Sequence, residues 1–432
     1  MESGALGSNA GSLVDHFFRH EYGRLVATLM RAFPSAGLET IEDAVQTALA
    51  KALSTWRRDG LPDNPSAWLT SVARNTVLDT FRRQKTVNNA SSDLADAALQ
   101  ELPEPRTPYS LSEIEDDQLR MLFVCCDDEL SSQSQLVLAL KLLCGFSTRE
   151  IATRLFTNEE NVQKQLSRGR ARLKEVWSLR PEWADSPALP QILSRTETVL
   201  SVIYLLFNEG YSSLEHHAPI RQELCEEALR LGRLVTQHPA TATPEAWALL
   251  ALMEMHAARL ASRRDGQGGL LMLEQQDRTL WDRAGIQRGF VCLARAADGD
   301  NFSRYHAEAA VVAEHCIAPT FEQTRWGEIV ALYEMLDARQ PSAIHTLNRA
   351  IALAEWKGPE AGLELLAQCE PPRWLAGYYL WDATHGELLR RASAFEEARR
   401  YLDRAIESAP TQAERHIFEQ KRARCDNRDA TR

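Results

Sequence analysis

Three cations recur at four-residue spacing near the middle of the chain, at Lys164, Arg168 and Arg172. Side chains four residues apart share one face of an α-helix, so this spacing predicts a cationic helix face. Apolar residues of the same segment lie on the opposite face, at Val162, Leu166 and Leu173. Ammonium and guanidinium groups bind phosphates and the acceptor atoms of guanine. Because the whole chain has a formal net charge of -11, this concentration of positive charge indicates contact with nucleic acid.

The cationic segment is predicted to be the second of two short helices. Ser147 with Glu150, and Thr157 with Glu160, fit the capping box, in which a hydroxyl and a carboxylate bond the free amides of the first helical turn. Two helices joined by a tight turn form a helix-turn-helix, whose second helix enters the major groove of DNA. A solvated basic face on an ordinary helix is the alternative, and the paired start signals favour DNA binding over it.

Helical periodicity runs through the rest of the chain, and no alternating strand pattern is found, so the predicted fold is all-α. Two polar stretches that contain proline, 86–110 and 180–190, divide the chain into three parts. In the first part, residues 38–56 are predicted to form an amphipathic helix. Its apolar stripe is predicted to contain Ile41, Val45, Leu49 with Ala48, Leu53 with Ala52, and Trp56. Its solvent side is expected to carry Glu39, Glu42, Asp43 and Gln46.

The next helix has a capping residue at Asn64 and a proline in its first position, Pro65. It is predicted to have a basic end, formed by Arg82, Arg83 and Lys85. In the third part, the related cores "NRAIAL" (348–353) and "DRAIES" (403–408) place small alanines where helices cross closely. This pattern predicts a tetratricopeptide-like helical repeat, with an irregular helical bundle as the alternative.

Catalytic and metal-binding patterns are missing from the sequence. The eight cysteines show no C-x-x-C pair, which favours reduced, buried thiols over a metal site. No nucleophile has an adjacent base and no phosphate-binding loop occurs, so no enzymatic activity, cofactor or metal is expected. The N-terminus lacks the features of a signal peptide and no apolar run reaches about 20 residues, so a cytoplasmic protein without a membrane contact is expected.

In their order along the chain, "IEDAVQTAL", "AWLTSVARNTVLDTFRR", a linker and the helix-turn-helix resemble the extracytoplasmic-function sigma factors of bacterial RNA polymerase. This resemblance covers about residues 13–176. Blocks such as "VLSVIYLLFNEGYSS" and "LLMLEQQDRTLWDR" are similar to the subgroup with a long tetratricopeptide-like extension. The resemblance implies two small helical domains, a flexible linker and a helical regulatory domain. They are sigma region 2 (12–85), the linker (86–111), sigma region 4 (112–180) and the extension (190–425).

The resemblance also implies roles for individual residues. Residues expected to dock on the clamp helices of the polymerase β′ subunit are Glu42, Asp43 and Gln46; Thr47 stands where the family often has an acid. Asn75 would receive a base flipped from the melted minus-ten element, and its neighbours would follow the opened DNA: Arg74, Asp79, Arg82, Arg83 and Lys85. Residues expected at the minus-thirty-five element are Arg149, Gln163, Lys164, Ser167, Arg168 and Arg172.

Gln163 and Ser167 depart from the basic and aromatic residues that are common at these positions in the family. A purine-rich DNA element is predicted, because Gln prefers adenine edges whereas Lys and Arg prefer guanine. The linker is acidic. The resemblance implies that it threads the polymerase channel, with a plain flexible tether as the alternative, and that region 4 contacts the β flap.

The predicted function is promoter recognition, DNA melting and transcription initiation with core RNA polymerase, controlled by the C-terminal domain. A helix-turn-helix regulator that acts without polymerase is the alternative, and Asn75 and the acidic helix favour the sigma factor. Candidate contacts of the extension with the sigma domains, polymerase or a regulatory protein are Asn208, Glu209, Tyr211, Asp277, Arg278 and Trp281. An enzymatic alternative would use Asn208, Glu209, Asp277, Arg278, Trp281 and Asp282, but buried polar networks between stacked helices explain these residues better. A chain that ends after Arg180 is expected to keep both sigma domains folded and to change transcription several-fold.

Overall fold

The computed structural model describes residues 21–87, 114, 116–179, 189–213, 220–265, 270–299, 301–369 and 378–429. Most of the expected linker, from residue 88 to 111, therefore lies outside the described residues. The described chain is helical, as predicted, and its β-type pairing is confined to one bridge between Arg264 and Leu270. Within these ranges, no helix combines the length and the apolar character that a membrane crossing requires.

The chain divides into two compact units, and the division falls within helix α9. The first unit contains residues 1–202 and 237–241, and the second contains residues 203–236 and 242–432. Helices of the first unit are residues 21–32, η1 (Pro34–Ala36), α2 (Gly37–Asp59), α3 (Pro65–Val87), α5 (Asp117–Cys125), α6 (Ser132–Leu142), α7 (Thr148–Arg154), α8 (Glu159–Leu179) and the first half of α9 (Leu189–Tyr211).

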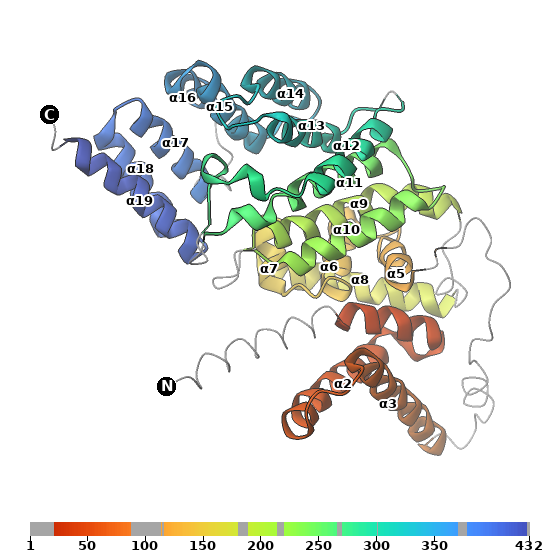
Figure 1. Ribbon diagram of the computed structural model, residues 1–432. Helices are drawn as coiled ribbons and strands as arrows, with labels where there is room; N and C mark the ends of the chain where they lie inside the picture. The colour runs from red at the N-terminus through yellow and green to blue at the C-terminus, as the bar shows by residue number, and fades with distance from the viewer. Residues whose placement is uncertain are drawn as a thin grey trace. The chain divides into compact units, whose positions relative to one another are not determined.

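The second unit is built mainly from α-helices (Figure 1), and its described residues also form short 3-10 segments. They are α10 (Gln222–Gln237), α11 (Pro244–Ala257), η3 (Leu260–Arg263), η4 (Leu273–Gln275), η5 (Arg278–Leu280), α12 (Arg283–Ala296), α13 (Arg304–Ile317), α14 (Trp326–Arg339), α15 (Ala343–Lys357), α16 (Pro359–Ala367), α17 (Tyr379–Arg391), α18 (Phe395–Ser408) and α19 (Gln412–Asp429).

Local sequence signals fix the ends of α2 and α3. Gly60 takes a positive φ of 85° after the last residue of α2, and its N–H donates to the Trp56 carbonyl at 3.1 Å. Asn64 caps α3 through its side-chain oxygen, which accepts from the Ala67 N–H at 3.0 Å, and Pro65 is the first residue, as predicted. The two helices then meet through the Trp56 and Trp68 rings, whose centroids lie 5.5 Å apart in an edge-to-face arrangement.

One member of the predicted stripe on α2 is misplaced. Leu53 is 39% exposed, whereas Ala52 is fully buried and continues the stripe of Ile41, Val45 and Ala48. The physical reason is the helical period: at 100° per residue, a position 12 residues after Ile41 lies 120° away from it, but a position 11 residues after lies only 20° away. Spacing by four residues therefore leaves the buried face after three turns.

From α11 to α19, each helix of the second unit packs against the next along the chain (Figure 1). Figure 1 shows α17, α18 and α19 side by side, and their shared core contains Leu389, Phe395 and Leu402. Ala350 of "NRAIAL" and Ala405 of "DRAIES" are both fully buried, as expected for small residues at helix crossings. This serial packing is consistent with a helical repeat, and the tetratricopeptide-like assignment stays a prediction.

Candidate nucleic-acid interface

The helix-turn-helix has one of its two predicted capping boxes. Ser147 caps α7: its hydroxyl accepts from the Glu150 N–H at 3.1 Å, and the Glu150 carboxylate accepts from the Ser147 N–H at 2.6 Å. The predicted box at Thr157 and Glu160 is wrong. Asn158 caps α8 instead, since its side-chain oxygen accepts from the Asn161 N–H at 2.8 Å. Asparagine is among the best N-cap residues and lies directly before the helix, so it displaces the threonine from this role.

The turn between α7 and α8 is a Schellman motif. The Thr157 N–H donates to the Ala152 carbonyl at 2.9 Å, and the Phe156 N–H donates to the Thr153 carbonyl at 3.3 Å. The residue in the left-handed conformation is Phe156, with φ 50°, where glycine is the usual choice. A left-handed L-residue costs about 1–2 kcal/mol, so this half-exposed aromatic is held at the turn against a local strain.

The recognition helix α8 buries one side and exposes the other, as its sequence pattern predicts. Val162 and Leu173 are fully buried and Leu166 is nearly so. The predicted minus-thirty-five residues that lie exposed are Arg149 on α7 and Gln163, Lys164, Ser167 and Arg168 on α8. The Lys164 ammonium pairs with Glu160 at 2.6 Å on the surface. Surface pairs of this kind contribute little free energy, so the lysine can exchange this partner for a phosphate.

Arg172 is the exception among the predicted minus-thirty-five residues, and its expected solvent-facing orientation needs correction. Its side chain is 21% exposed and pairs with Glu129 at 2.5 Å and with Glu175 at 2.9 Å. It also lies 3.7 Å from the buried Asp127. Acids from the segment before α6 reach this point of α8 and attract the guanidinium inward, so Arg172 stabilises the domain in this conformation.

The predicted minus-ten residues lie along one helix, α3. Arg74, Asn75, Asp79, Arg82 and Arg83 are exposed, and the side chain of Lys85 lies outside the described part. The Arg82 guanidinium bonds Asp79 at 3.0 Å. The exposed amide of Asn75 offers both a donor and an acceptor, which is the requirement for binding the edge of an unstacked base.

The acidic face of α2 differs from expectation at one residue. Asp43 and Gln46 are exposed, but Glu42 is only 6% exposed, so its predicted position on the solvent side is wrong. Its Oε1 accepts from the Tyr22 hydroxyl at 2.9 Å and from the Arg170 guanidinium at 2.7 Å. Burial and the neighbouring carboxylate raise the pKa of Tyr22 well above its ordinary value, so the phenol stays a proton donor.

Tyr22 and Arg170 belong to two segments that pack on α2, which the sequence of α2 alone could not reveal. The helix of residues 21–32 approaches α6 so closely at Gly23 that a Cβ there would lie 2.1 Å from the Leu143 carbonyl oxygen. A second ion pair joins the same parts of the chain, between Arg31 and Asp117 at 2.7 Å. The segments matching the two predicted sigma domains are therefore in direct contact in this structure.

The first half of α9 belongs to the core of the first unit. The Arg195 guanidinium is 2% exposed and donates to the Phe123 carbonyl at 3.0 Å, to Asp127 at 3.1 Å and to Asp128 at 3.1 Å. Asp127 is the same carboxylate that Arg172 of the recognition helix approaches. A chain that ends after residue 180 lacks Arg195, so we expect Asp127 to lose an ion-pair partner and region 4 to lose stability in that chain.

The candidate contacts of the extension lie largely inside the second unit. Glu209 is fully buried, and Trp281, 3% exposed, donates from its indole nitrogen to the Ser262 hydroxyl at 2.8 Å. Arg278 donates to the Ala318 carbonyl at 2.7 Å, after the end of α13. The remaining residues are half-buried or act as helix caps: Asn208, Tyr211, Asp277 and Asp282. Glu209 and Trp281 therefore hold the helices together and are not available to a partner at the surface, whereas Asp277 and Asp282 are exposed.

All eight cysteines are unpaired thiols, and seven of them are buried. Burial raises the pKa of Cys126 to about 12, so this thiol stays protonated at neutral pH. Among the described residues, no group of three or more His, Cys, Asp and Glu side chains could hold a metal ion.

Comparison with known proteins assigns both parts of the first unit. The family model described as Sigma-70 region 2 matches residues 18–87, and the model of Sigma-70 region 4 matches residues 120–173. A family of unknown function matches residues 195–297. An ECF RNA polymerase sigma factor, SigX of Bacillus subtilis (strain 168), is 24% identical over 145 residues, which cover 33% of this chain and 74% of SigX.

An uncharacterized protein of Rhizobium meliloti (strain 1021) is 36% identical over 403 residues, which cover 90% of each chain. No solved structure matches this chain. The match to the Rhizobium protein places both proteins in one family along nearly their whole length, including the C-terminal extension. Taken with regions 2 and 4, these similarities show that the chain belongs to the sigma-70 family, as a factor of the extracytoplasmic-function type.

Proposed function

We propose that this protein binds core RNA polymerase, directs it to promoters and opens the DNA there. Regions 2 and 4 of sigma-70 give the chain a role in promoter recognition. The observation that carries the finer proposal is the exposed Asn75 on α3, within the region 2 match, with Arg74 beside it and two further arginines toward the helix end. A regulator that binds only duplex DNA has no use for a base-binding amide on a second domain.

The two DNA elements are proposed to meet different helices. On α8, Gln163 and Ser167 would read base edges, and Lys164 and Arg168 would bind guanine or phosphate. On α3, Asn75 would bind the flipped base, and the cations Arg74, Arg82, Arg83 and Lys85 would follow the phosphates of the opened strand.

Core polymerase is proposed to dock through α2. Asp43 and Gln46 are exposed there and would bind the β′ clamp helices, and region 4 would bind the β flap. A pull-down of core polymerase separates this function from the alternative regulator. Asp43→Lys should reduce the amount of polymerase that the protein captures. Glu39→Lys makes the same charge change at an exposed residue of the same helix, and it should capture more polymerase than Asp43→Lys. No capture of polymerase by the unaltered protein would favour the regulator. Equal capture by both variants would remove Asp43 from the proposed polymerase contact.

Binding at both elements requires the two sigma domains to separate. Elements centred at minus ten and minus thirty-five lie about 25 base pairs apart, roughly 85 Å along a duplex at 3.4 Å per base pair. Arg170 lies on the recognition helix and Glu42 on the polymerase-binding helix, and they are bonded at 2.7 Å. The two domains cannot keep this ion pair while they occupy both promoter elements. We therefore propose that the structure represents a closed form, which opens when the protein binds the promoter with polymerase.

The C-terminal extension is proposed to control this activity, and the boundary of the first unit decides how to test it. Transcription with reconstituted holoenzyme should be compared for the full chain, a chain ending after Val202 and a chain ending after Arg180. The chain to Val202 retains Arg195 and its three partners, so it should stay folded and change transcription several-fold. The chain to Arg180 should lose region 4 stability as well. Unchanged transcription by the chain to Val202, at every promoter, would remove the regulatory role from the extension.

A further inference from the structure

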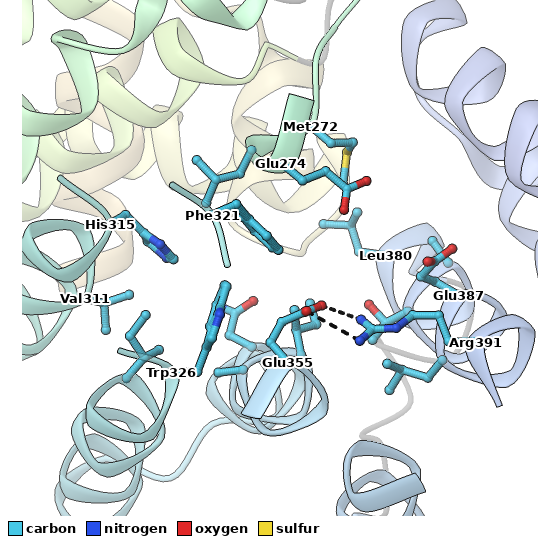
Figure 2. Close-up of a pocket in the computed structure, with 18 of the residues that line it drawn as sticks. Met272, Glu274, Val311, His315, Phe321, Trp326, Glu355, Leu380, Glu387 and Arg391 are labelled. Carbon is cyan, nitrogen blue, oxygen red and sulfur yellow. Dashed lines mark hydrogen bonds and ion pairs between the residues drawn. The ribbon is translucent and has the colours of Figure 1, made fainter. Parts of the chain in front are cut away.

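The second unit contains a cavity of about 360 Å³ that the promoter-binding function does not use. Its walls come from the η4 segment and from α13, α14, α15, α17 and α19, as Figure 2 shows in part. A volume of this size is typical of sites that bind small molecules. Because all lining residues belong to one compact unit, the cavity is a property of the extension itself.

One wall of the cavity is aromatic. The ring centroids of Phe321 and Trp326 lie 5.0 Å apart, and those of His315 and Trp326 lie 5.3 Å apart, both in edge-to-face arrangements. Val311 and Ile329 add aliphatic surface to the same wall. Flat apolar surfaces of this kind favour a planar ring, which gains both burial and ring-to-ring contact.

His315 gives the aromatic wall an unsatisfied polar atom. Its side chain is 9% exposed, and its Nδ1 is buried without a hydrogen-bond partner among the described residues. Figure 2 shows the imidazole pointing into the cavity beside Phe321 and Trp326. Burial, with the nearby Arg259 and Arg278, lowers the pKa of His315 to about 3, so the ring is neutral at pH 7. A neutral, unpartnered imidazole in a cavity is a hydrogen-bonding group that awaits a ligand.

The opposite wall carries two ion pairs, and the exposed carboxylate of Glu274 also lines the cavity. Arg391 bonds both carboxylate oxygens of Glu355 (Figure 2), and the Lys421 ammonium lies 3.4 Å from the Glu387 carboxylate. A charged ligand would have to break one of these pairs in a partly buried setting. An uncharged ligand can approach them as a hydrogen-bonding partner without that cost.

We propose that this cavity binds a small planar aromatic molecule without net charge, which packs against Trp326 and Phe321 and hydrogen-bonds to His315. Binding does not depend on the proposed control of transcription, so the two ideas can fail separately.

Saturation-transfer NMR on the full-length protein tests the proposal with indole, a neutral bicyclic ring whose N–H can donate to the free imidazole nitrogen. Indole-3-acetate and tryptamine serve as anionic and cationic probes of similar shape. Indole should show transfer at millimolar concentration, and both charged probes should bind at least about fivefold more weakly. No transfer to indole, or equal transfer to all three, would overturn the proposal.

Two variants locate the binding. Leu380 lines the cavity and is 36% exposed, so Leu380→Trp should fill the mouth and abolish transfer. Val291→Trp places the same ring on an exposed position of α12, away from the cavity lining, and should leave transfer unchanged. Equal transfer from both variants would show that indole binds elsewhere.

His315→Leu separates a ligand-binding role from a structural one. It removes an unsatisfied polar atom from the ligand-free protein and should therefore raise the Tm by about 2–4 °C. It should also weaken indole binding at least about tenfold. A fall in Tm would identify His315 as a structural residue, and unchanged indole binding would remove it from the site. Either result would overturn the proposal.

Discussion

Arg170→Ala should shift the first unit from the closed form toward an open form. In the closed form, the Arg170 guanidinium bonds the carboxylate of Glu42 at 2.7 Å, and the Glu42 side chain is only 8% exposed. The substitution leaves that carboxylate buried with a hydrogen bond from the Tyr22 hydroxyl at 2.9 Å. Opening would return Glu42 to water, so loss of the arginine penalises the closed form and not the open one.

The size of this shift follows from the geometry of the pair. A hydrogen bond to a charged group contributes about 1.5–3 kcal/mol. The Arg170 side chain is 36% exposed, so solvent screens the pair and the lower end of this range applies. A change of about 1.5 kcal/mol corresponds to a roughly tenfold change in the ratio of open to closed protein.

Two measurements check the shift. With dyes at the exposed positions Ser54 and Lys174, energy transfer between α2 and α8 should fall in the Arg170→Ala variant. The apparent affinity for core polymerase should rise by up to about tenfold, because a larger fraction of the protein is competent to bind. Arg168→Ala is the control, since it removes the same charge from an exposed position of the same helix. Unchanged energy transfer together with unchanged polymerase affinity would refute the closed form as a barrier to binding.

The remaining predictions concern the DNA contacts and the pH dependence of stability. Asn75→Ala should preserve binding to core polymerase and impair promoter opening; normal selectivity of the variant on premelted templates would exclude Asn75 from the base pocket. Arg168→Ala should weaken promoter binding by about 1–3 kcal/mol and relax preference at one base pair, whereas Arg172→Ala should mainly lower the stability of region 4, as measured by amide exchange. The pKa of His315, about 3, lies below the ordinary value of about 6.5. As pH falls below about 6.5, this histidine therefore takes up a proton in the unfolded chain before it does so in the folded protein. Stability should therefore be complete above pH 6.5 and should fall by about 2 kcal/mol at pH 5, and His315→Leu should remove that part of the loss in a denaturant titration.

The elements that depend on local chemistry were predictable from the sequence. Asn64 and Ser147 cap their helices because a side chain of the right type stands directly before the first turn. Val162, Leu166 and Leu173 are buried because their spacing follows the helical period. These features require only a few neighbouring residues, and no partner from elsewhere in the chain can easily override them.

Features that depend on distant partners were not predictable. Glu42 and Arg172 are charged residues on amphipathic helices, and a helical wheel places such residues in solvent. Each is instead drawn inward by opposite charges from other segments, Arg170 in one case and Glu129 in the other. The sequence contains no signal that pairs Glu42 with a residue 128 positions away. For Arg195, the lone basic residue within an otherwise apolar and hydroxyl-rich start of α9 was an available signal of a buried ion pair.

The recognition helix shows why the charge pattern alone overstates the number of DNA contacts. Arg168 and Arg170 are two residues apart, so they project about 200° apart around α8. The first is exposed, while the second bonds Glu42. Counting basic residues therefore predicts a steeper salt dependence of promoter binding than the closed protein can produce, because Arg170 is already neutralised within the chain.

The same ion pair connects the two binding events that we propose for this protein. Arg170 lies on the helix proposed to meet promoter DNA, and Glu42 lies on the helix proposed to meet polymerase. If each partner binds only the open form, the first partner to bind breaks this bond, and the second partner then meets a protein that is already open. By thermodynamic linkage, each partner raises the affinity of the other by the same factor. The limit of that factor is the free energy of the bond, about 1.5 kcal/mol or roughly tenfold. A single pair at 2.7 Å can therefore make this protein bind promoters weakly alone and more tightly with polymerase.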